Sequence, residues 1–307
     1  MKTYFPPEGT EELLQKSKAY FASLYTLEEA RNRHILLEGR VVRCDRAHNL
    51  HVQLGAMEGI ISRENCAIGI QEGTLRDIAI LSRVGKSVCF YIESIDFDES
   101  GKPVARLNRR AVQEDCREQY LHTLSPGDLL DAVVTRMEPF GAFCDVGAGV
   151  PALLPIDSIC VSRIPHPRAR FYVGQPIRAI FRALAPDGKI TLTHKELLGT
   201  WSENAAHFSV GETVPGIVRS VESYGIFIEL TPNLAGLAEY SPHVHAGESA
   251  SVYIKAICPE KMKFKLILID HGPAAPTNFS YSYPQISHVS TWPYSPPFCE
   301  KQVKTVF

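Results

Sequence analysis

The feature that most constrains this chain of 307 residues is an internal repeat. Residues 126–154 align without a gap with residues 210–238, at an offset of 84 (210 − 126). Both copies contain an aromatic-Gly-x-aromatic motif, at 140–143 and at 224–227. A fixed period of this kind indicates that one supersecondary unit occurs more than once along the chain. The sequence therefore predicts a tandem array of small modules.

A third and weaker copy lies nearer the N-terminus. Gly39 matches Gly216, and Gly59 matches Gly236, both at an offset of 177 (216 − 39). Each copy continues with a turn and an alternating apolar strand, and it ends in a short basic strand. About five short strands in roughly 60–75 residues, separated by turn signals, predict a small closed barrel of the OB type.

The segments outside the repeats predict helices and a tail. Residues 111–124 and 195–208 have a helix-forming composition and connect successive copies. The N-terminal segment is also expected to be helical, with a capping box that begins at Thr26 and opens a helix towards Leu37. The fold class is therefore all-β, with three tandem OB-fold five-stranded barrels, helical connectors and an N-terminal helical segment. The expected boundaries are 1–36 for the helical segment, 37–110, 126–195 and 210–270 for the three copies, and 271–307 for the C-terminal tail.

The tail differs in composition from the rest of the chain. Its first half is rich in Pro, Ser and Tyr, and its end carries Val289, Trp292 and Phe298. These large apolar side chains are enough to dock the end of the tail on a barrel, and the sequence leaves open whether it docks.

Composition limits the partners of this chain. It has 32 Lys plus Arg against 34 Asp plus Glu, which gives a formal charge of −2. A nucleic acid would therefore have to be held by local patches and not by bulk charge. No apolar run approaches the ~18 residues that span a bilayer, and the first residues lack the apolar core of a secretory signal. These features predict a soluble, cytoplasmic protein without membrane contact.

The aromatic-Gly-x-aromatic motifs are the candidate binding site. Residues three apart on a regular strand point to opposite faces, so the glycine is expected to supply a bulge or kink that brings both rings to one surface. Two exposed rings can stack unpaired bases, at ~1–3 kcal/mol per base. The alternative is that the rings fill the barrel core. The expected RNA-binding residues are Phe140, Phe143, Arg136, Arg178, Arg182 and Lys189 in the middle copy, and Tyr224, Phe227, Arg219, Lys255, Lys263 and Lys265 in the last.

No catalytic or metal-binding pattern accompanies these motifs. The eight cysteines include no Cys-x-x-Cys pair. Residues 85–87 read Gly-Lys-Ser, but Ile80 stands where a phosphate-binding loop needs its first glycine. His243 and His245 have no third metal ligand that the sequence places near them. We therefore expect no enzyme activity, no metal and no small-molecule cofactor.

The repeats resemble the S1 RNA-binding domain, the repeat of bacterial ribosomal protein S1. The family pattern contains Phe-Gly-x-Phe-Val-Asp-Leu and a final Gly-Arg-Ile-x-Leu-Ser. The middle copy has FGAFCDVG and GKITLTHKE, and the last has YGIFIELT and MKFKLIL. The resemblance covers residues 37–270 and implies barrels that bind single-stranded RNA through the aromatic pair and a basic residue on the final strand, Lys189 or Lys263. It also implies that the protein holds mRNA at the small ribosomal subunit and assists translation.

The sequence departs from the family at three points. The family's base-contacting His is Pro155 in the middle copy and Glu239 in the last, where a carboxylate would repel a phosphate. The family's Arg is Lys in both copies, which removes a planar, bidentate donor. In the first copy, Ala47 and Leu50 stand where the rings should be (224 − 177 = 47; 227 − 177 = 50). A second function therefore stays open: an adaptor that docks on ribosomal or transcription-machinery proteins, with RNA binding weak or incidental.

Overall fold

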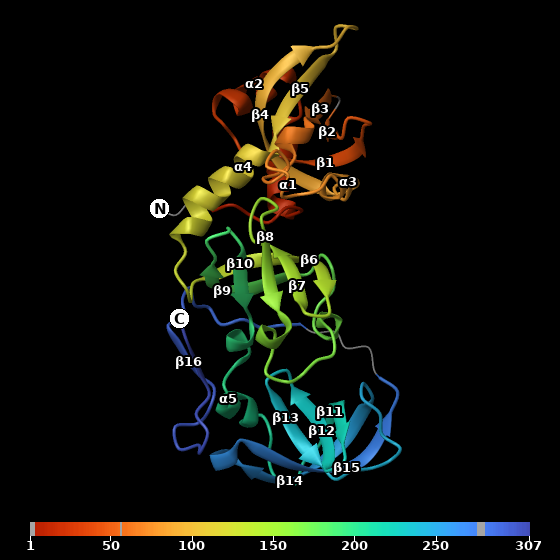
Figure 1. Cartoon of the computed structure of the whole chain (residues 1–307), viewed down its shortest axis with the longest axis vertical. Helices are drawn as coiled ribbons and strands as arrows, with labels where there is room; N and C mark the ends of the chain where they lie inside the picture. Colours follow the sequence, from red (N-terminus) through yellow and green to blue (C-terminus); the bar gives the residue numbers. More distant parts are fainter. Residues whose placement is uncertain (1–3, 56, 275–279) are drawn as a thin grey trace. The chain divides into compact units, whose positions relative to one another are not determined.

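The expected strands, with their alternating apolar residues, form three closed five-stranded barrels (Figure 1). The structure is a computed structural model, and it describes residues 4–55, 57–274 and 280–307. Most of the regular structure is strand, and the helices are few and short. The predicted all-β class with three OB-like barrels is confirmed.

The first barrel has the strand order β1-β2-β3-β5-β4. Its strands pair antiparallel except for β3 and β5, which run parallel and close the barrel. The core is aliphatic, and Val41, Leu50 and Leu107 are almost completely buried in it. The strands are β1 (Leu37–Cys44), β2 (Leu50–Leu54), β3 (Met57–Ile61), β4 (Ser87–Phe97) and β5 (Pro103–Asn108), and the short helices are η1 (Arg63–Asn65) and α3 (Ile78–Leu81).

The middle and last barrels repeat this topology. Their strand orders are β10-β8-β7-β6-β9 and β11-β12-β13-β15-β14, and a parallel pair closes each one. The middle strands are β6 (Leu129–Glu138), β7 (Gly141–Asp145), β8 (Pro151–Pro155), β9 (Pro176–Leu184) and β10 (Ile190–Thr193). The last strands are β11 (Thr213–Glu222), β12 (Gly225–Thr231), β13 (Leu234–Ala238), β14 (Ser249–Cys258) and β15 (Lys263–Gly272).

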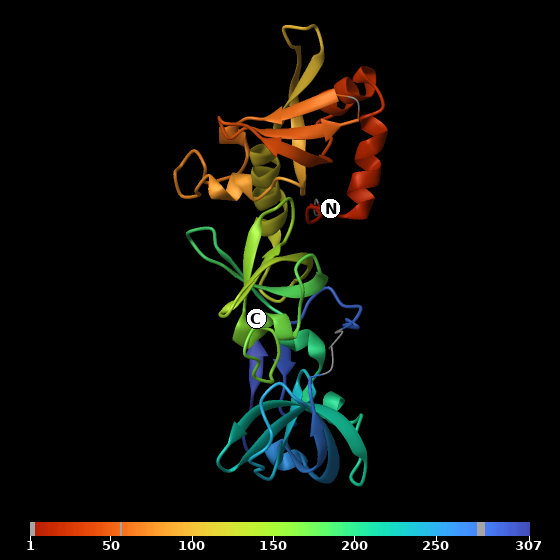
Figure 2. The same cartoon turned by 90° about the vertical axis from the view of Figure 1, so that its right-hand side faces the viewer.

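Two helices precede the first barrel, α1 (Glu11–Tyr20) and α2 (Leu24–Asn32) (Figure 2). The expected capping box is displaced by three residues, because Ser23 is the N-cap and Thr26 is the partner that closes the box. The helix also ends earlier than expected, and Leu37 begins β1. Thr26 was predicted to be the N-cap, but it is the third residue of the helix, where its hydroxyl takes the place of the usual Glu or Gln side chain in the capping box.

The connectors are helical but irregular. After β5 the chain forms α4 (Arg109–Asp115), then a π-helical segment (Cys116–Tyr120) and a 3-10 turn (Leu121–Thr123). After β10 it forms a 3-10 segment (Lys195–Leu198) and the short helix α5 (Trp201–Ala205). Gly199 separates these two pieces at φ +81°, a conformation that favours glycine.

The chain divides into two compact units, which are described separately. The first comprises the residues up to Leu124 together with Asp131–Val133 and Asp145–Pro151. The remainder forms the second unit, which includes the last barrel and most of the middle barrel. The turn after β7 thus belongs to the first unit by its contacts.

A cluster of buried charges lies in the first unit. Arg109 is 1% exposed and donates hydrogen bonds to the Glu8 carboxylate at 2.6 and 3.0 Å. Asp145 accepts from the Glu8 backbone N–H at 2.8 Å, and Glu38 accepts from the Gly9 N–H. Burial raises the pKa of Glu38 to about 8 and the pKa of Asp145 to about 7, and the charge of Glu8 adds to both effects. Glu38 is therefore mostly protonated at neutral pH, whereas Asp145 titrates close to it.

The end of the tail packs within the second unit. Trp292 is 6% exposed in the core of the last barrel, and Val289 packs partly against the same core, whereas Phe298 is 67% exposed. The docking that the sequence left open is thus made by Trp292 and not by Phe298. Residues 275–279 lie outside the described residues. The tail strands, β16 (Thr291–Pro293) and β17 (Lys304–Val306), pair as a hairpin (Figure 2).

His194 holds an upstream part of the tail. Its Nδ1 lies 3.0 Å from the Ile159 carbonyl oxygen, which can only accept, so Nδ1 carries the proton. Nε2 accepts from the Tyr283 hydroxyl at 2.9 Å, and the ring packs edge to face with Tyr281 and Phe171. Burial lowers the pKa of His194 to about 4, so the imidazole is neutral at pH 7.

Candidate nucleic-acid interface

The two aromatic motifs lie at the tips of β-hairpins. β7 begins at Gly141 and β12 begins at Gly225, so Phe140 and Tyr224 belong to the preceding turns. The irregularity expected at each glycine is therefore a hairpin turn and not a bulge within the strand. The first ring of each pair leaves from a turn and the second from a strand, so the strict alternation of a regular strand does not separate them.

Glycine is required in these motifs because the neighbouring strand comes very close. A Cβ atom at Gly225 would lie 2.5 Å from the Ala238 carbonyl oxygen, and one at Gly141 would lie 2.5 Å from the Leu154 carbonyl oxygen. Both distances are below normal contact. Gly225 also has φ +152°, which side chains rarely allow. Only glycine lets the hairpin turn at this place without displacing the next strand.

Each motif presents two rings at right angles. The Phe140 and Phe143 centroids are 6.0 Å apart at 90°, and the Tyr224 and Phe227 centroids are 6.1 Å apart at 87°. Phe140 is 56% exposed and Tyr224 is 68% exposed, while the second ring of each pair is half-buried. Edge-to-face packing is a favourable arrangement that fixes the outer ring. Phe140 and Tyr224 therefore do not fill the barrel core, which was the alternative for these rings.

In the middle barrel Arg136 lies beside the rings, and Lys189 is exposed just before β10. The Arg136 guanidinium lies 5.7 Å from the Phe143 ring centroid, and Arg136 also pairs with Glu138 at 2.6 Å. Lys189 pairs with Asp187 at 2.6 Å and its side chain is 83% exposed. Exposed pairs of this kind contribute little free energy, so either cation can turn to a phosphate at small cost. Arg182 is exposed as well and lies near Ser158, with 3.4 Å between Nη1 and Oγ.

Two of the expected phosphate ligands are engaged elsewhere. Arg178 donates hydrogen bonds of 3.1 Å to the carbonyls of Pro284 and Ile286 in the tail. Arg219 donates two hydrogen bonds to the Glu229 carboxylate at 2.7 and 3.1 Å, and its side chain is only 9% exposed. These two arginines therefore hold the protein together in this structure, and the expectation that they face RNA needs correction.

In the last barrel a continuous outward row joins the rings to the lysines. Phe227 on β12 pairs with Leu237 on β13, and Leu237 pairs with Lys265 on β15. Lys263 lies two residues from Lys265 on the same face of β15, and both are exposed. Sequence analysis missed Leu237, which is 37% exposed and forms an apolar floor beside the rings. The repeat itself carried the signal, because Leu153 occupies the same place at the offset of 84.

The remaining positions follow the departures seen in the sequence. Lys255 is exposed on β14, and Glu239 is exposed just after β13, close in sequence to Leu237. In the first barrel the corresponding position is Leu50, which is fully buried, so this position carries no exposed aromatic ring. A platform of two rings therefore occurs in the middle and last barrels.

The described part of the chain holds no group of three or more His, Cys, Asp or Glu side chains that could bind a metal ion. Among the helices that the structure describes, none is long and apolar enough to cross a membrane.

Three closed five-stranded barrels, two of which carry an exposed pair of aromatic rings, define a protein built from tandem OB-type modules. Comparison with known families agrees, because residues 123–195 match the S1 RNA binding domain. The middle barrel therefore matches the S1 domain family, and the chain is similar to S1 proteins. This family is an RNA-binding domain and not a class of enzyme.

The curated relatives are ribosomal proteins. The small ribosomal subunit protein bS1 of Staphylococcus aureus is 28% identical over 176 residues, which cover 55% of this chain and 44% of that protein. The bS1 homolog of Bacillus subtilis is 28% identical over 188 residues, covering 56% and 48%. The matches thus span less than half the length of these relatives. A solved multidomain protein with nucleic acid binding domains from Streptococcus pneumoniae is 14% identical, covers 80% of this chain and 75% of that chain, and has a TM-score of 0.24, which carries no argument.

Proposed function

We propose that this protein binds single-stranded RNA on the outer faces of the middle and last barrels. The observation that carries the proposal is the recurrence of an exposed, edge-to-face ring pair at the same place in two barrels. Unpaired bases stack on Phe140 and Phe143 in one barrel and on Tyr224 and Phe227 in the other. Stacking contributes ~1–3 kcal/mol per base and tolerates any base, so sequence preference is expected to be low.

The phosphates are held by exposed cations of the two barrels. These are Arg136, Arg182 and Lys189 in the middle barrel, and Lys255, Lys263 and Lys265 in the last. Each neutralised phosphate releases counterions, so log K should fall with log salt at a slope near −0.7 per phosphate for a single strand. The formal charge of −2 adds no long-range attraction, which makes these local contacts decisive.

Two weak barrels on one chain bind more tightly than either alone. Once one platform holds an RNA strand, the other meets the same strand at a high effective concentration. The supporting relatives are proteins of the small ribosomal subunit. We therefore propose that the strand is mRNA, that the protein acts in the cytoplasm near the small ribosomal subunit, and that it assists translation.

A protein-interaction adaptor is the second candidate, and the last barrel favours it. Arg219 is used inside the barrel by Glu229, and the exposed carboxylate of Glu239 follows the strand that carries Leu237. This carboxylate would repel a phosphate at the platform. An apolar floor beside an acidic group suits a protein surface better than an RNA backbone.

The test is fluorescence anisotropy of a short labelled oligouridylate titrated with the full chain at low and moderate salt. The Phe140→Ala plus Phe143→Ala variant should lose more than ~1 kcal/mol of binding free energy, because it removes one stacking platform. Tyr224→Ala plus Phe227→Ala tests the last barrel in the same way. Tyr172→Ala is the matched control, since it removes an exposed ring of the middle barrel that lies outside the motif.

The outcomes separate the two candidates. Salt-sensitive binding that weakens in the first double variant but not in Tyr172→Ala supports RNA binding at the middle barrel. Binding that ignores both double variants, or no binding at all, would refute the platform mechanism. A pull-down against ribosomal subunits with and without nuclease would then test the adaptor.

A further inference from the structure

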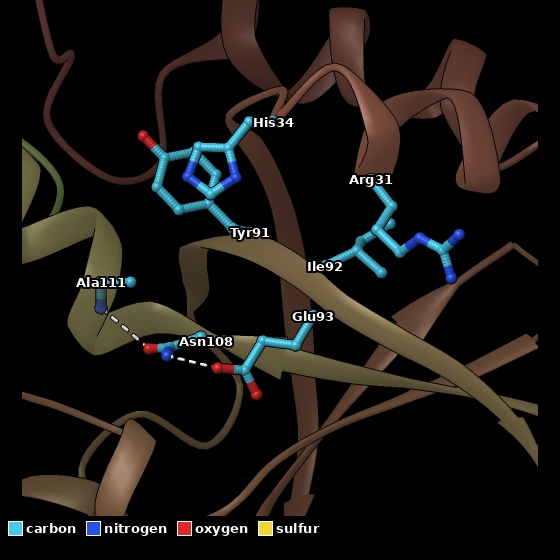
Figure 3. Close-up of a pocket in the computed structure, with 7 residues that line it drawn as sticks. All are labelled: Arg31, His34, Tyr91, Ile92, Glu93, Asn108 and Ala111. Atoms are coloured by element: carbon cyan, nitrogen blue, oxygen red, sulfur yellow. Dashed lines mark hydrogen bonds between the residues drawn. The ribbon is translucent and has the colours of Figure 1, made fainter.

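The first unit carries a pocket that the proposed RNA platforms do not use. Its volume is about 410 Å³, and it lies between the end of α2, the outer face of β4 and the start of α4 (Figure 3). In this barrel the position that corresponds to a platform lies around β2 and is occupied by Leu50. The lining residues are Arg31, His34, Tyr91, Ile92, Glu93, Asn108 and Ala111.

A stacked pair of rings forms one wall of the pocket. The His34 ring lies over the Tyr91 ring, with 3.9 Å between centroids and 30° between planes (Figure 3). Tyr91 is 6% exposed and donates its hydroxyl hydrogen to Asp115 at 3.0 Å, so it is a fixed support. His34 is exposed and follows α2 at φ +52°, a left-handed conformation that commonly ends a helix. The end of α2 thus places the His34 imidazole at the edge of the pocket.

A carboxylate lies beside these rings. Glu93 lies at the register shift between Ile92 and Ser94 on β4, and it lines the pocket together with Tyr91. The Glu93 Oε1 atom accepts a hydrogen bond from Asn108 Nδ2 at 2.7 Å (Figure 3), and its Oε2 atom accepts a longer one from Asn65 Nδ2 at 3.4 Å, so both oxygens are oriented. Asn108 is itself fixed, because its Oδ1 accepts from the Ala111 N–H at the start of α4. A carboxylate has about four acceptor positions, so Glu93 keeps capacity for a ligand.

A cation completes the pocket. Arg31, in the last turn of α2, lines the side of the pocket away from the rings (Figure 3). Its Nη2 lies 3.2 Å from Asn32 Oδ1, which leaves further guanidinium donors for an anion. A planar guanidinium is well suited to phosphate oxygens. The pocket therefore offers the face of an aromatic ring, two oriented carboxylate oxygens and a guanidinium that can donate hydrogen bonds to a phosphate.

We infer that this pocket binds one guanine nucleotide. The base would stack on the His34 imidazole, and its adjacent N1–H and N2–H donors would meet the two oxygens of Glu93. Arg31 would hold the phosphate. Adenine lacks that pair of adjacent donors, and a pyrimidine offers less stacking area. The inference goes beyond the platforms and stands independently of them. The ligand is either a free guanine nucleotide or an unpaired guanosine within RNA, since both present the same chemistry.

The test uses the full chain labelled on its histidine rings and followed by NMR. The His34 ring signal is assigned by its loss in His34→Ala. Titration with GMP should move this signal upfield through the ring current of the stacked base, and AMP should require an at least fivefold higher concentration for the same shift. A second arm compares two short oligouridylates, one with a single central G and one with a single central A.

Variants separate recognition from folding. His34→Phe keeps a stacking face and should retain GMP binding, whereas His34→Ala should weaken it by about 5- to 150-fold, the range of one base–aromatic stack. In titrations followed by calorimetry, Glu93→Gln should lose the preference for GMP over AMP. Glu99→Gln is the matched control, because Glu99 is exposed in the turn after β4 and outside the pocket.

The two arms also identify the source of the guanine. A shift with GMP and none with the G-containing oligonucleotide assigns the site to free nucleotides, and a shift at lower concentrations of the G-containing oligonucleotide than of GMP assigns it to RNA. The inference is overturned if neither ligand shows a preference for G, or if the preference survives both His34→Ala and Glu93→Gln. Loss of RNA binding in the platform variants, with GMP binding intact, would leave this site standing.

Discussion

Replacing Glu38 with Gln should stabilise the first unit, and the effect should grow with pH. The Glu38 side chain is fully buried, and its Oε2 atom has no hydrogen-bond partner among the described residues. Glu8 and Asp145 place two further carboxyls near it. Glutamine keeps the acceptor for the Gly9 N–H and removes the charge that burial penalises.

The magnitude follows from the pKa of Glu38. A pKa of about 8 in the folded chain, against 4.5 for an exposed glutamate, means that the folded state holds a proton that the unfolded state releases. The folded state therefore binds more protons between about pH 4.5 and pH 8, and stability falls as pH rises through this window. At 1.36 kcal/mol for each pH unit, the loss reaches at most roughly 5 kcal/mol above pH 8. Glu38→Gln should remove most of this slope.

The assay is native-state hydrogen exchange of peptides that cover β1 at several pH values. Both tryptophans of the chain, Trp201 and Trp292, lie in the second unit, so their fluorescence provides an internal control that Glu38→Gln should not change. Glu28→Gln, on the exposed face of α2, is the matched control. A Glu38→Gln protein that opens more readily than the native chain at pH 8, or with an unchanged pH slope, would refute the argument.

Three further outcomes follow from the second unit. Arg170→Met breaks a buried ion pair at 2.5 Å and should destabilise this unit by ~3 kcal/mol, measured by the tryptophan unfolding transition, whereas the exposed Arg168→Met should have no effect. The pKa of His194, at about 4, lies below its ordinary 6.5, so this unit should lose stability as pH falls from 6.5 to 4, and His194→Gln should flatten that loss. Gly225→Ala should weaken RNA binding through displacement of the hairpin, while Gly247→Ala, which has open space around it, should leave binding unchanged.

The fold was predictable because its signals are local. Period-two patterns, glycine turns and the 84-residue offset specify short strands whatever the rest of the chain does. The outward position of Phe140 and Tyr224 was also predictable, since both barrels already had enough aliphatic residues for a core. The reason for the glycines was not, because it depends on a carbonyl from the next strand, 2.5 Å from where a Cβ of Gly225 would be.

The guanine pocket also escaped sequence analysis. Its rings come from His34 and Tyr91, which are 57 residues apart (91 − 34), and no motif joins them. The helix start at Ser23 was missed for a smaller reason, since a Thr replaced the usual acidic partner in the capping box. The pocket depends on contacts between distant segments, whereas the helix start depends on a less common form of a local pattern.

By itself, the sequence determined that this chain is a tandem array of OB-type barrels and that two of them carry an exposed aromatic ring pair. Only the tertiary structure decided which charges remain available to a ligand. Arg178 is 106 residues from Pro284, whose carbonyl it binds, and Arg170 is 59 residues from Glu229. A cation looks the same in a sequence whether it faces solvent or a carboxylate, because its partner is chosen by the packing of distant segments. Hydrophobic periodicity can be read from neighbouring residues in the sequence, whereas the partner of a charged side chain depends on which distant segments pack together.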